Sequence, residues 1–210
     1  VRPDQRQPVA AADLHPGDVV LEVGPGLGVL TDALAMVAGR VVAVELDPAM
    51  RHVLASTVRH HANVEIVAGD VLRAAPDVLV GAGAAPSGRL VGYKVVANLP
   101  YQITSPLLFG LIRDAAAIAQ AVLMMQQEVG TRLLASPGAK DYGILSVLVQ
   151  YHFRVTRLFS LSPGNFYPPP QVDSVVLRLV PETPAPAALD PNLLRQVVKT
   201  AFGHRRKTLN

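Results

Sequence analysis

The sequence predicts an α/β fold built on a mostly parallel, seven-stranded sheet with helices on both faces. Three observations support this prediction. Short apolar runs alternate with helical patterns along the chain, which is typical of a parallel sheet that is covered on both sides. Half of the 210 residues are apolar and 17% are charged, so the chain can bury a sizeable core. A buried run also leads into a glycine-rich turn that opens a helical segment.

The seven predicted strands are apolar runs, and the last two look like a closing antiparallel pair. They are Asp18–Gly24, Arg40–Glu45, Val64–Ala68, Tyr93–Ala97, Ala121–Met125, Val155–Leu161 and Ser174–Leu179. Helical patterns fill most of the intervals. They cover Leu27–Val37, Pro48–Arg59, Ser105–Ala119, Glu128–Ala135, Gly143–Phe153 and Leu193–Phe202. Pro48 suits a helix start, where its missing N–H costs nothing. The β-branched residues in Gly143–Phe153 leave a strand open there.

Two segments rich in small residues and proline divide the chain. Ala82–Gly88 contains Gly, Ala, Pro and Ser and is expected to form a surface loop. Pro181–Pro191 is rich in Pro and Ala and is interpreted as a linker. We therefore expect a first domain over residues 1–181, followed over residues 182–210 by the linker and the start of a truncated helical domain. The chain begins at Val1 and stops after a basic run, and we expect a fragment that is cut at both ends.

Composition excludes several kinds of site. The chain has no cysteine, which excludes a disulfide scaffold, a Cys-type zinc site, an iron–sulfur cluster and a thiol nucleophile. This composition is compatible with a reducing cytoplasm, where we expect the protein to act as a monomer. No stretch reaches 18 apolar residues without a charge, so no transmembrane helix is expected. His60 and His61 have no acid or Cys partner at metal-ligand spacing, so we interpret them as solvated and expect no metal.

The net charge of +3 is unevenly placed. The segment Leu194–Asn210 holds five basic residues and no acid, namely Arg195, Lys199, Arg205, Arg206 and Lys207. Such an asymmetry indicates an anionic partner, of which nucleic acid is the commonest. A solvated helix end remains an alternative.

The sharpest local signal is the segment Leu21–Gly28, with the sequence LEVGPGLG. Glycine adopts positive φ and lets the backbone approach a ligand, and the helix that follows presents free N–H groups. Both features predict a nucleotide-type cofactor at Gly24, Gly26 and Gly28. A dehydrogenase fingerprint needs glycine where Val29 stands, so the spacing favours S-adenosylmethionine (SAM). Glu22 can orient the turn or the cofactor, and a tight turn without a ligand remains an alternative.

Two acids follow the next two predicted strands. Glu45 ends the second strand, where a carboxylate can accept hydrogen bonds from both ribose hydroxyls. Asp70 follows the third strand and can accept a hydrogen bond from an adenine amino group, or cap a helix that begins at Val71. Together with their neighbours Leu46 and Val71, these acids are expected at the carboxyl edge of the sheet, where open α/β folds bind ligands.

The fourth strand leads into Asn98-Leu-Pro-Tyr101. The side-chain carbonyl of Asn98 and the backbone carbonyl of Leu99 can accept both hydrogens of an exocyclic amine. With both hydrogens held, the lone pair of the amine nitrogen would point at a methyl donor. This arrangement supplies proximity and orientation. Pro100 makes the turn rigid, and Tyr101 would stack on a base that has been unstacked from its own helix.

Phe166 stands in a proline-rich loop, Pro163–Pro170. An aromatic ring in such a loop can stack on a base. Packing of the ring within the protein is the alternative.

These motifs together resemble those of the ribosomal RNA adenine dimethyltransferases. Asn98–Tyr101 matches the Asn/Asp-x-Pro-Tyr motif of amino-group methyltransferases. The other matching segments are Leu21–Thr31, Glu45–Asp47, Gly69–Asp70 and Phe166–Ser174. The ending Ala201–Asn210 is similar to the small-subunit branch, the kasugamycin-sensitivity enzymes. Two rivals stay open: the large-subunit branch of macrolide-resistance enzymes, and a non-catalytic RNA-binding assembly or transcription factor on the same fold.

The resemblance implies a Rossmann-like methyltransferase fold and a specific reaction. The family transfers methyl groups from SAM, two per base, to two adjacent adenosines near the 3′ end of small-subunit ribosomal RNA during ribosome assembly. The positions that match its SAM contacts are Gly24, Glu45, Asp70 and Asn98. Asn98 also matches the position that binds the target amine, and Tyr101 and Phe166 match the aromatics on the two faces of the adenine.

The resemblance also bears on the two ends of the chain. Arg205, Arg206 and Lys207 would bind RNA phosphates through charge. Nothing in Val1–Leu14 matches the Gly-Gln-Asn-Phe-Leu segment with which the family closes over its cofactor. The helical C-terminal domain of the family would begin where this chain stops.

Overall fold

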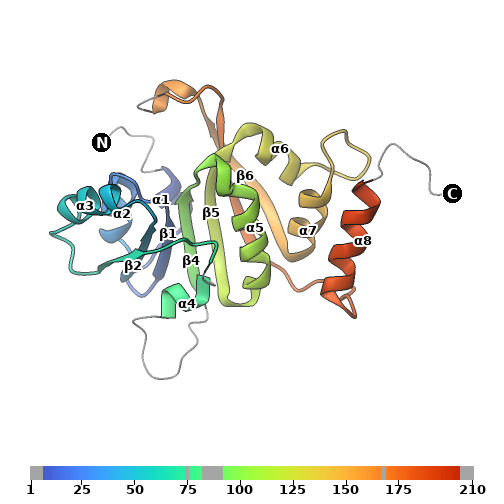
Figure 1. Ribbon diagram of the computed structural model, residues 1–210, viewed down its shortest axis with the longest axis horizontal. Coiled ribbons are helices and arrows are strands. Elements are labelled where there is room, and N and C mark those ends of the chain that lie inside the picture. The colour runs from blue at the N-terminus through green and yellow to red at the C-terminus, as the bar shows by residue number, and fades with distance from the viewer. Residues whose placement is uncertain (1–6, 74–75, 82–91, 167–168, 204–210) are drawn as a thin grey trace.

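The computed structural model describes residues 7–73, 76–81, 92–166 and 169–203, and it confirms the predicted α/β class (Figure 1). Seven strands form one sheet: β1 Val19–Val23, β2 Arg40–Glu45, β3 Val64–Ala68, β4 Tyr93–Asn98, β5 Ile118–Gln126, β6 Phe153–Leu161 and β7 Ser174–Pro181. Their order is β3-β2-β1-β4-β5-β7-β6. The first five strands are parallel, while β7 runs antiparallel to both β5 and β6, as predicted for the closing pair.

Helices connect the strands and cover the sheet. They are α1 Gln7–Ala11, α2 Val29–Ala35, α3 Pro48–Thr57, α4 Pro76–Gly81, α5 Thr104–Arg113, α6 Gln127–Leu134, α7 Ile144–His152 and α8 Pro191–Gly203. Alternate residues of each strand point to opposite faces of the sheet, so the protein has a core on each face. Leu21 and Leu123 belong to the core under α4, α5, α6 and α7, whereas Val20 and Val122 pack under α1 and α2. The third helix, α3, packs on Ala43 on this second face.

Several predicted helix boundaries differ from the observed ones, and two of these differences have a clear physical cause. The helix predicted over Ser105–Ala119 ends at Arg113. A short 3₁₀ turn follows, and Ile118 already belongs to β5, where it pairs with Tyr93. Alanines in the turn are good helix formers, but the pairing between the strands prevails over that preference. The helix predicted from Leu27 begins instead at Val29, because Gly28 adopts a left-handed conformation with φ of 84° at its N-cap.

Other elements were left open or not predicted. The segment after Gly143 forms a helix, α7, so the strand alternative is wrong there, and β6 begins at Phe153. The sequence analysis did not identify α1 and α4, which have only five and six residues. The loop predicted over Ala82–Gly88 lies outside the described residues.

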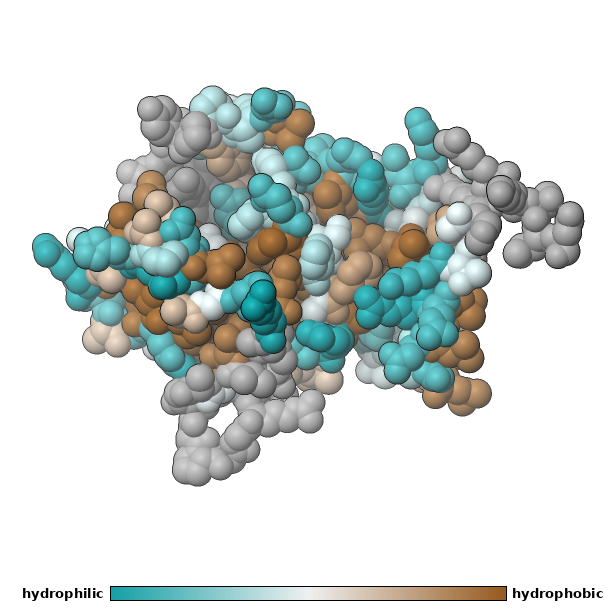
Figure 2. Space-filling view, viewed as in Figure 1, coloured by the Kyte–Doolittle hydropathy of each residue, from teal (hydrophilic) through white to brown (hydrophobic). Residues whose placement is uncertain are grey.

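The described part of residues 182–203 packs onto the rest of the molecule. The Tyr151 hydroxyl donates to the carbonyl of Pro186 (2.9 Å) and accepts from the amide of Ala188 (2.6 Å), which fixes the proline-rich connection. The Arg195 guanidinium of α8 lies 5.0 Å from the ring centre of Phe109 on α5. Figure 2 shows hydrophilic residues gathered over α8 on the face toward the viewer. Within the described ranges, no helix has both the length and the apolar character needed to cross a bilayer.

Candidate active site

The turn after β1 depends on its glycines. Gly24, Gly26 and Gly28 have φ values of 66°, 55° and 84°, in the left-handed region that other residues adopt at a cost. At two of these positions, neighbouring side chains also leave little room for a Cβ atom. A Cβ at Gly24 would lie 3.2 Å from the side chain of Pro100, and one at Gly28 would lie 2.7 Å from Leu54 on α3. The glycine turn is therefore pressed between α3 and the turn that follows β4.

A pocket of about 270 Å³ opens at this turn. It is bounded by the glycine turn, by the ends of β4 and β5, and by the loop after β6. Among its walls are five residues that the sequence analysis singled out: Glu22, Gly24, Gly26, Asn98 and Phe166. The carboxyl edge of the sheet thus gathers residues that lie up to 144 positions apart in the chain.

Glu22 is the buried acid of this pocket. Only 1% of its surface is exposed, and its Oε2 has no hydrogen-bond partner among the described residues. Burial raises the pKa of Glu22 to about 8; the negative charge of Glu45 adds to this effect, and the nearby Thr31 hydroxyl opposes it. Buried polar atoms are normally hydrogen-bonded, so an unpartnered carboxyl oxygen in a pocket wall is suited to a ligand that brings a donor.

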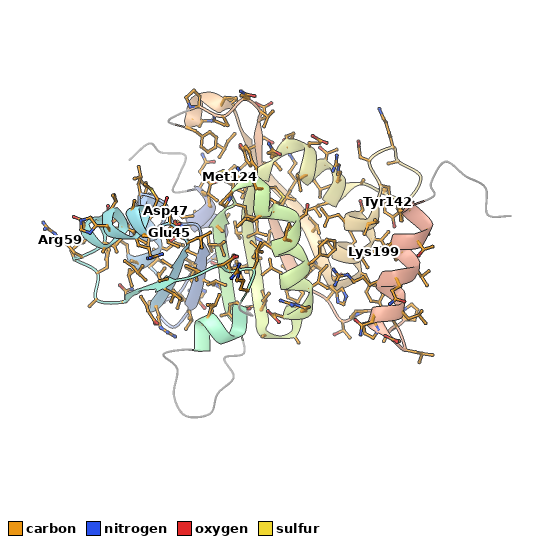
Figure 3. The ribbon with its side chains drawn as sticks, viewed as in Figure 1. Glu45, Asp47, Arg59, Met124, Tyr142 and Lys199 are labelled. Carbon is orange, nitrogen blue, oxygen red and sulfur yellow. The ribbon has the colours of Figure 1, made fainter. Side chains whose placement is uncertain are left out.

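Glu45 ties the glycine turn to the end of β2. Its carboxylate accepts hydrogen bonds from the amides of Gly26 (3.2 Å) and Asp47 (2.9 Å). Figure 3 shows Glu45 and Asp47 close together at this edge of the sheet. Asp47 in turn caps α3 by accepting from the amide of Ala49 (2.7 Å). Leu46 stands between them with 65% of its surface exposed, which offers an apolar surface at the same edge.

Asp70 lies next to Glu45 across the sheet, where the amide of Gly69 donates to the carbonyl of Glu45 (3.3 Å). The Asp70 carboxylate accepts from the amide of Leu72 (2.9 Å). Residues 71–73 form a turn rather than a helix, so the helix-cap alternative for Asp70 is wrong. Val71 is not brought to the pocket beside the glycine turn. It packs in the core under α5 and lines a separate space with Leu107.

The Asn98–Tyr101 segment is held firmly at the end of β4. The Leu99 amide donates to the carbonyl of Met124 on β5 (3.0 Å), and the Leu99 side chain is buried. The Pro100 carbonyl accepts from the Thr104 hydroxyl (3.3 Å) at the start of α5. The backbone of this turn is therefore fixed by the sheet on one side and by α5 on the other.

A second, open space of about 310 Å³ lies beyond this turn. Leu99, Pro100 and Tyr101 line it, and so do Asn98 and Phe166. Because Asn98 and Phe166 line both spaces, they form the wall between a recess at the glycine turn and a more exposed one beside Tyr101. The structure therefore brings all five predicted chemical residues to the junction of two adjoining recesses.

The sequence analysis missed residues that reach the pocket from other elements. Met124 is buried at the end of β5, opposite Asn98 in register, and it also lines the pocket. Figure 3 labels it beside the upper end of the sheet. Pro8 of α1 is a further wall residue. The register of parallel strands would have indicated Met124, whereas no local signal marked Pro8.

Side chains from the sheet position α1 at the pocket. Lys94 donates to the carbonyl of Asp13 (2.5 Å) and pairs with Asp18 (2.9 Å). Gln120 donates to the carbonyl of Ala12, and Arg178 donates to that of Ala11 (2.7 Å). These contacts anchor the last carbonyl of α1 and the carbonyls of the two residues that follow it, where the hydrogen bonding of the helix has ended. They hold this helix beside the pocket, which Pro8 lines, although its sequence does not match the closing segment of the family that the motifs resemble.

Two other predictions concern residues away from the pocket. His60 and His61 were expected to be solvated and to have no acidic partner. The His60 side chain is 60% exposed, as expected, but that of His61 is only 13% exposed, and the expectation that neither has an acidic partner is wrong. Their Nε2 atoms lie 3.1 Å and 2.9 Å from Oδ1 of Asp32 on α2, an acid that the sequence separates from His61 by 29 positions. The predicted phosphate-binding residues Arg205, Arg206 and Lys207 lie outside the described residues.

Comparisons with known proteins agree with the geometry. The family model "Ribosomal RNA adenine dimethylase" matches residues 6–210. The chain is 48% identical over 206 residues to a ribosomal RNA small subunit methyltransferase A from Moorella thermoacetica, covering 97% of this chain and 72% of the relative. Among solved structures, a dimethyladenosine transferase from Plasmodium falciparum matches with a TM-score of 0.81 and 30% identity, over 100% of this chain and 72% of the other. The 23S rRNA methyltransferase ErmE matches with a TM-score of 0.75 and 28% identity, over 97% and 79%.

Proposed function

Because the chain belongs to the ribosomal RNA adenine dimethylase family, we propose that it dimethylates adenine amino groups of small-subunit ribosomal RNA, with SAM as the methyl donor. The substrate is two adjacent adenosines near the 3′ end of that RNA, modified while the ribosomal subunit is being assembled. The higher identity to small-subunit methyltransferases than to the 23S rRNA enzyme supports this substrate over large-subunit RNA.

The residues at the glycine turn suit SAM. Gly24, Gly26 and Gly28 let the backbone pass close to the cofactor, and Glu45 and Asp70 offer carboxylates for its ribose and its adenine amino group. The unpartnered oxygen of Glu22 suits the positively charged amino group of the methionine part. Leu46 provides an exposed apolar surface for the adenine ring. When bound, SAM supplies an electrophilic methyl group on a sulfonium centre.

The Asn98 turn orients the nucleophile. The side-chain carbonyl of Asn98 and the backbone carbonyl of Leu99 each accept one hydrogen of the adenine amine. This holds the nitrogen lone pair toward the pocket at the glycine turn, so proximity and orientation supply much of the acceleration. Tyr101 and Phe166 stack on the two faces of the flipped base. No general base is required, because the methylated nitrogen becomes acidic and releases its proton to water.

The single observation that carries this proposal is the position of Asn98. It lines both the recess at the glycine turn and the open space beside Tyr101. An amine held there from the open side therefore faces whatever occupies the inner recess. A methyl-transfer reaction between a base and a cofactor needs this arrangement.

The chain also has residues suited to RNA docking. We interpret residues 1–181 as the methyltransferase domain and residues 182–210 as a linker and a helical RNA-docking segment. Arg205, Arg206 and Lys207 would contact RNA phosphates, a contribution that weakens as salt is added. The exposed Arg195 and Lys199 of α8 extend this basic character onto the described surface.

The test is transfer of labelled methyl groups from SAM to immature small ribosomal subunits, with protein-free large-subunit RNA assayed in parallel. We expect label on two adjacent adenines of the small subunit. Asn98→Ala should lower the rate by about 100-fold or more while the melting temperature stays unchanged, because the Asn98 side chain is exposed. The matched control is Asn192→Ala on α8, which should retain full activity.

Each alternative predicts a different result. Label confined to large-subunit RNA would assign the chain to the other branch of the family. Binding of SAM without label on either substrate would support a non-catalytic assembly factor. Full activity of Asn98→Ala would refute the role of this residue in holding the amine.

A further inference from the structure

Asp32, His60 and His61 form a cluster outside the site described above. Asp32 lies in the first turn of α2, while the two histidines follow α3 in the connection to β3. Arg59, labelled in Figure 3, marks this outer end of α3. The fold thus brings the start of α2 and the connection after α3 together.

The donor atoms of the cluster converge on a small space. One nitrogen or oxygen from each residue lies within 4.8 Å of the other two. The Nε2 atoms of His61 and His60 lie 2.9 Å and 3.1 Å from the same carboxylate oxygen. Ligand distances of about 2.0–2.1 Å in a tetrahedral zinc site separate neighbouring donors by roughly 3.3 Å. The two distances between the histidines and the carboxylate are within a few tenths of an ångström of that value, and all three donors lie within 4.8 Å of one another.

The chemistry of this donor set indicates which metal it would take. Two imidazoles and one carboxylate suit zinc and similar first-row transition metals rather than magnesium or calcium, which prefer oxygen ligands. The side chain of His61 is only 13% exposed, while that of His60 is 60% exposed. One ligand is thus fixed by its surroundings, and the exposed ligand leaves a path for the ion to enter.

We propose that Asp32, His60 and His61 bind one divalent metal ion of the zinc class, with water completing its coordination. Both histidines coordinate through Nε2, so Nδ1 carries the proton of each neutral ring. The ion replaces the two contacts between the histidines and Asp32 with bonds to a shared centre. It thereby links α2 to the connection that follows α3.

The role of this ion is structural. None of its ligands is among the residues that line the pocket at the glycine turn. Asp32 nevertheless lies one helical turn after the glycine turn, because its amide donates to the carbonyl of Gly28 (2.9 Å). A metal that binds only the folded protein raises its free energy of unfolding by an amount that grows with the logarithm of the ratio of metal concentration to dissociation constant. We expect zinc to raise the melting temperature without being required for methyl transfer.

The test uses the untagged chain, because an affinity tag of histidines would bind the same metals. Calorimetric titration with ZnCl₂ should give one site per chain. Titration with CoCl₂ should produce the visible absorption bands of nitrogen- and oxygen-coordinated cobalt. Zinc should bind more weakly to each of three variants, Asp32→Asn, His60→Ala and His61→Ala. Loss of a residue that only supports a metal ligand lowers metal affinity by about 10–100-fold, so loss of a direct ligand should lower it at least as much. His52→Ala, which removes an exposed histidine of α3, is the matched control.

The outcomes separate a metal site from a hydrogen-bonded cluster. Binding that is lost in the three cluster variants and retained in His52→Ala would support the proposal, provided that circular dichroism shows each variant to be folded. No saturable binding to the wild-type chain would overturn it. So would binding that survives all three substitutions, since the ion would then lie elsewhere.

Discussion

Asn98 and Phe166 separate two recesses, so a few side chains decide what each recess can hold. The inner recess has glycines and a buried acid, Glu22, whereas the outer one has Pro100 and Tyr101. We propose that charge and hydrogen bonding select the ligand in the inner recess and that ring stacking selects it in the outer one. One prediction at the residue scale tests the stacking, and a second tests the burial of Glu22.

Tyr101 is predicted to act through its ring rather than its hydroxyl. Stacking of a base on an aromatic side chain contributes about 1–3 kcal/mol, so Tyr101→Ala should reduce kcat/KM for the RNA by about tenfold or more. Tyr101→Phe keeps the ring and should retain nearly all activity. Steady-state methylation of small subunits at varied RNA concentration distinguishes the variants. Equal losses in both would show that the hydroxyl matters instead.

Glu22 is predicted to make stability depend on pH. In the folded protein the pKa of Glu22 lies near 8, against an ordinary value of 4.5. Between pH 4.5 and pH 8, Glu22 is therefore protonated in the folded protein and ionised in the unfolded chain. Stability from neutral Glu22 is therefore complete below about pH 4.5 and decreases as the pH rises toward 8. Glu22→Gln removes this decrease.

Urea unfolding of Glu22→Gln at several pH values measures the effect. The measured quantity is the free energy of unfolding of Glu22→Gln minus that of wild type. This difference should be larger at pH 8 than at pH 5 by more than about 1 kcal/mol, roughly the value of one pKa unit. The exposed Glu128→Gln is the control and should show no such trend. Parallel pH profiles for Glu22→Gln and wild type would show that Glu22 is ionised in the folded protein.

At the scale of elements, close packing restricts the sequence more than helix preference does. Gly130 in α6 faces β7, and a Cβ at this position would lie 2.2 Å from Cγ1 of Val175. Gly110 in α5 has space, since the nearest atom to its Cβ would be the Arg113 guanidinium, 3.9 Å away. The same substitution should therefore have opposite effects in two helices of the same layer.

Gly110→Ala is predicted to stabilise the protein by about 0.5–1 kcal/mol, because alanine favours the helix by roughly that amount. Gly130→Ala should be destabilising, since overpacking costs about 1–3 kcal/mol and the overlap with Val175 is severe. Urea denaturation measures both effects. Adding Val175→Ala to Gly130→Ala should recover part of the loss, and stabilisation by Gly130→Ala alone would contradict the packing described here.

At the scale of the whole molecule, the inner recess draws walls from α1, from the turns after β1 and β4, and from the loop after β6. A ligand in it thus contacts segments from both halves of the sheet. We expect SAM at a hundred times its dissociation constant to raise the free energy of unfolding by about 2.7 kcal/mol. Hydrogen exchange should slow at the glycine turn and near Phe166 together. Protection confined to the glycine turn would show that the cofactor does not reach across the sheet.

Much of the fold and of the site could be predicted from the sequence because its signals are local. Runs of apolar residues identified all seven strands. The candidate site residues stand at the ends of these strands: the glycine turn, Glu45, Asp70 and Asn98. Parallel strands present their carboxyl ends at one edge of the sheet, so the sequence was sufficient to expect these residues close together. Helix ends were less certain. Alanines after Arg113 are compatible with a helix, and only the pairing of Ile118 with Tyr93 ends it.

Local sequence signals were enough to predict the strands, the glycine turn and the residues at the strand ends. The contacts between distant segments became visible only in the folded protein. The tertiary structure brought Pro8 and Met124 to the pocket, set Asp32 beside His60 and His61, and left the side chain of Glu22 buried with an unpartnered oxygen. The physical reason is that backbone preferences act between near neighbours in the chain. Burial, ion pairing and packing depend instead on which surfaces the folded chain brings into contact.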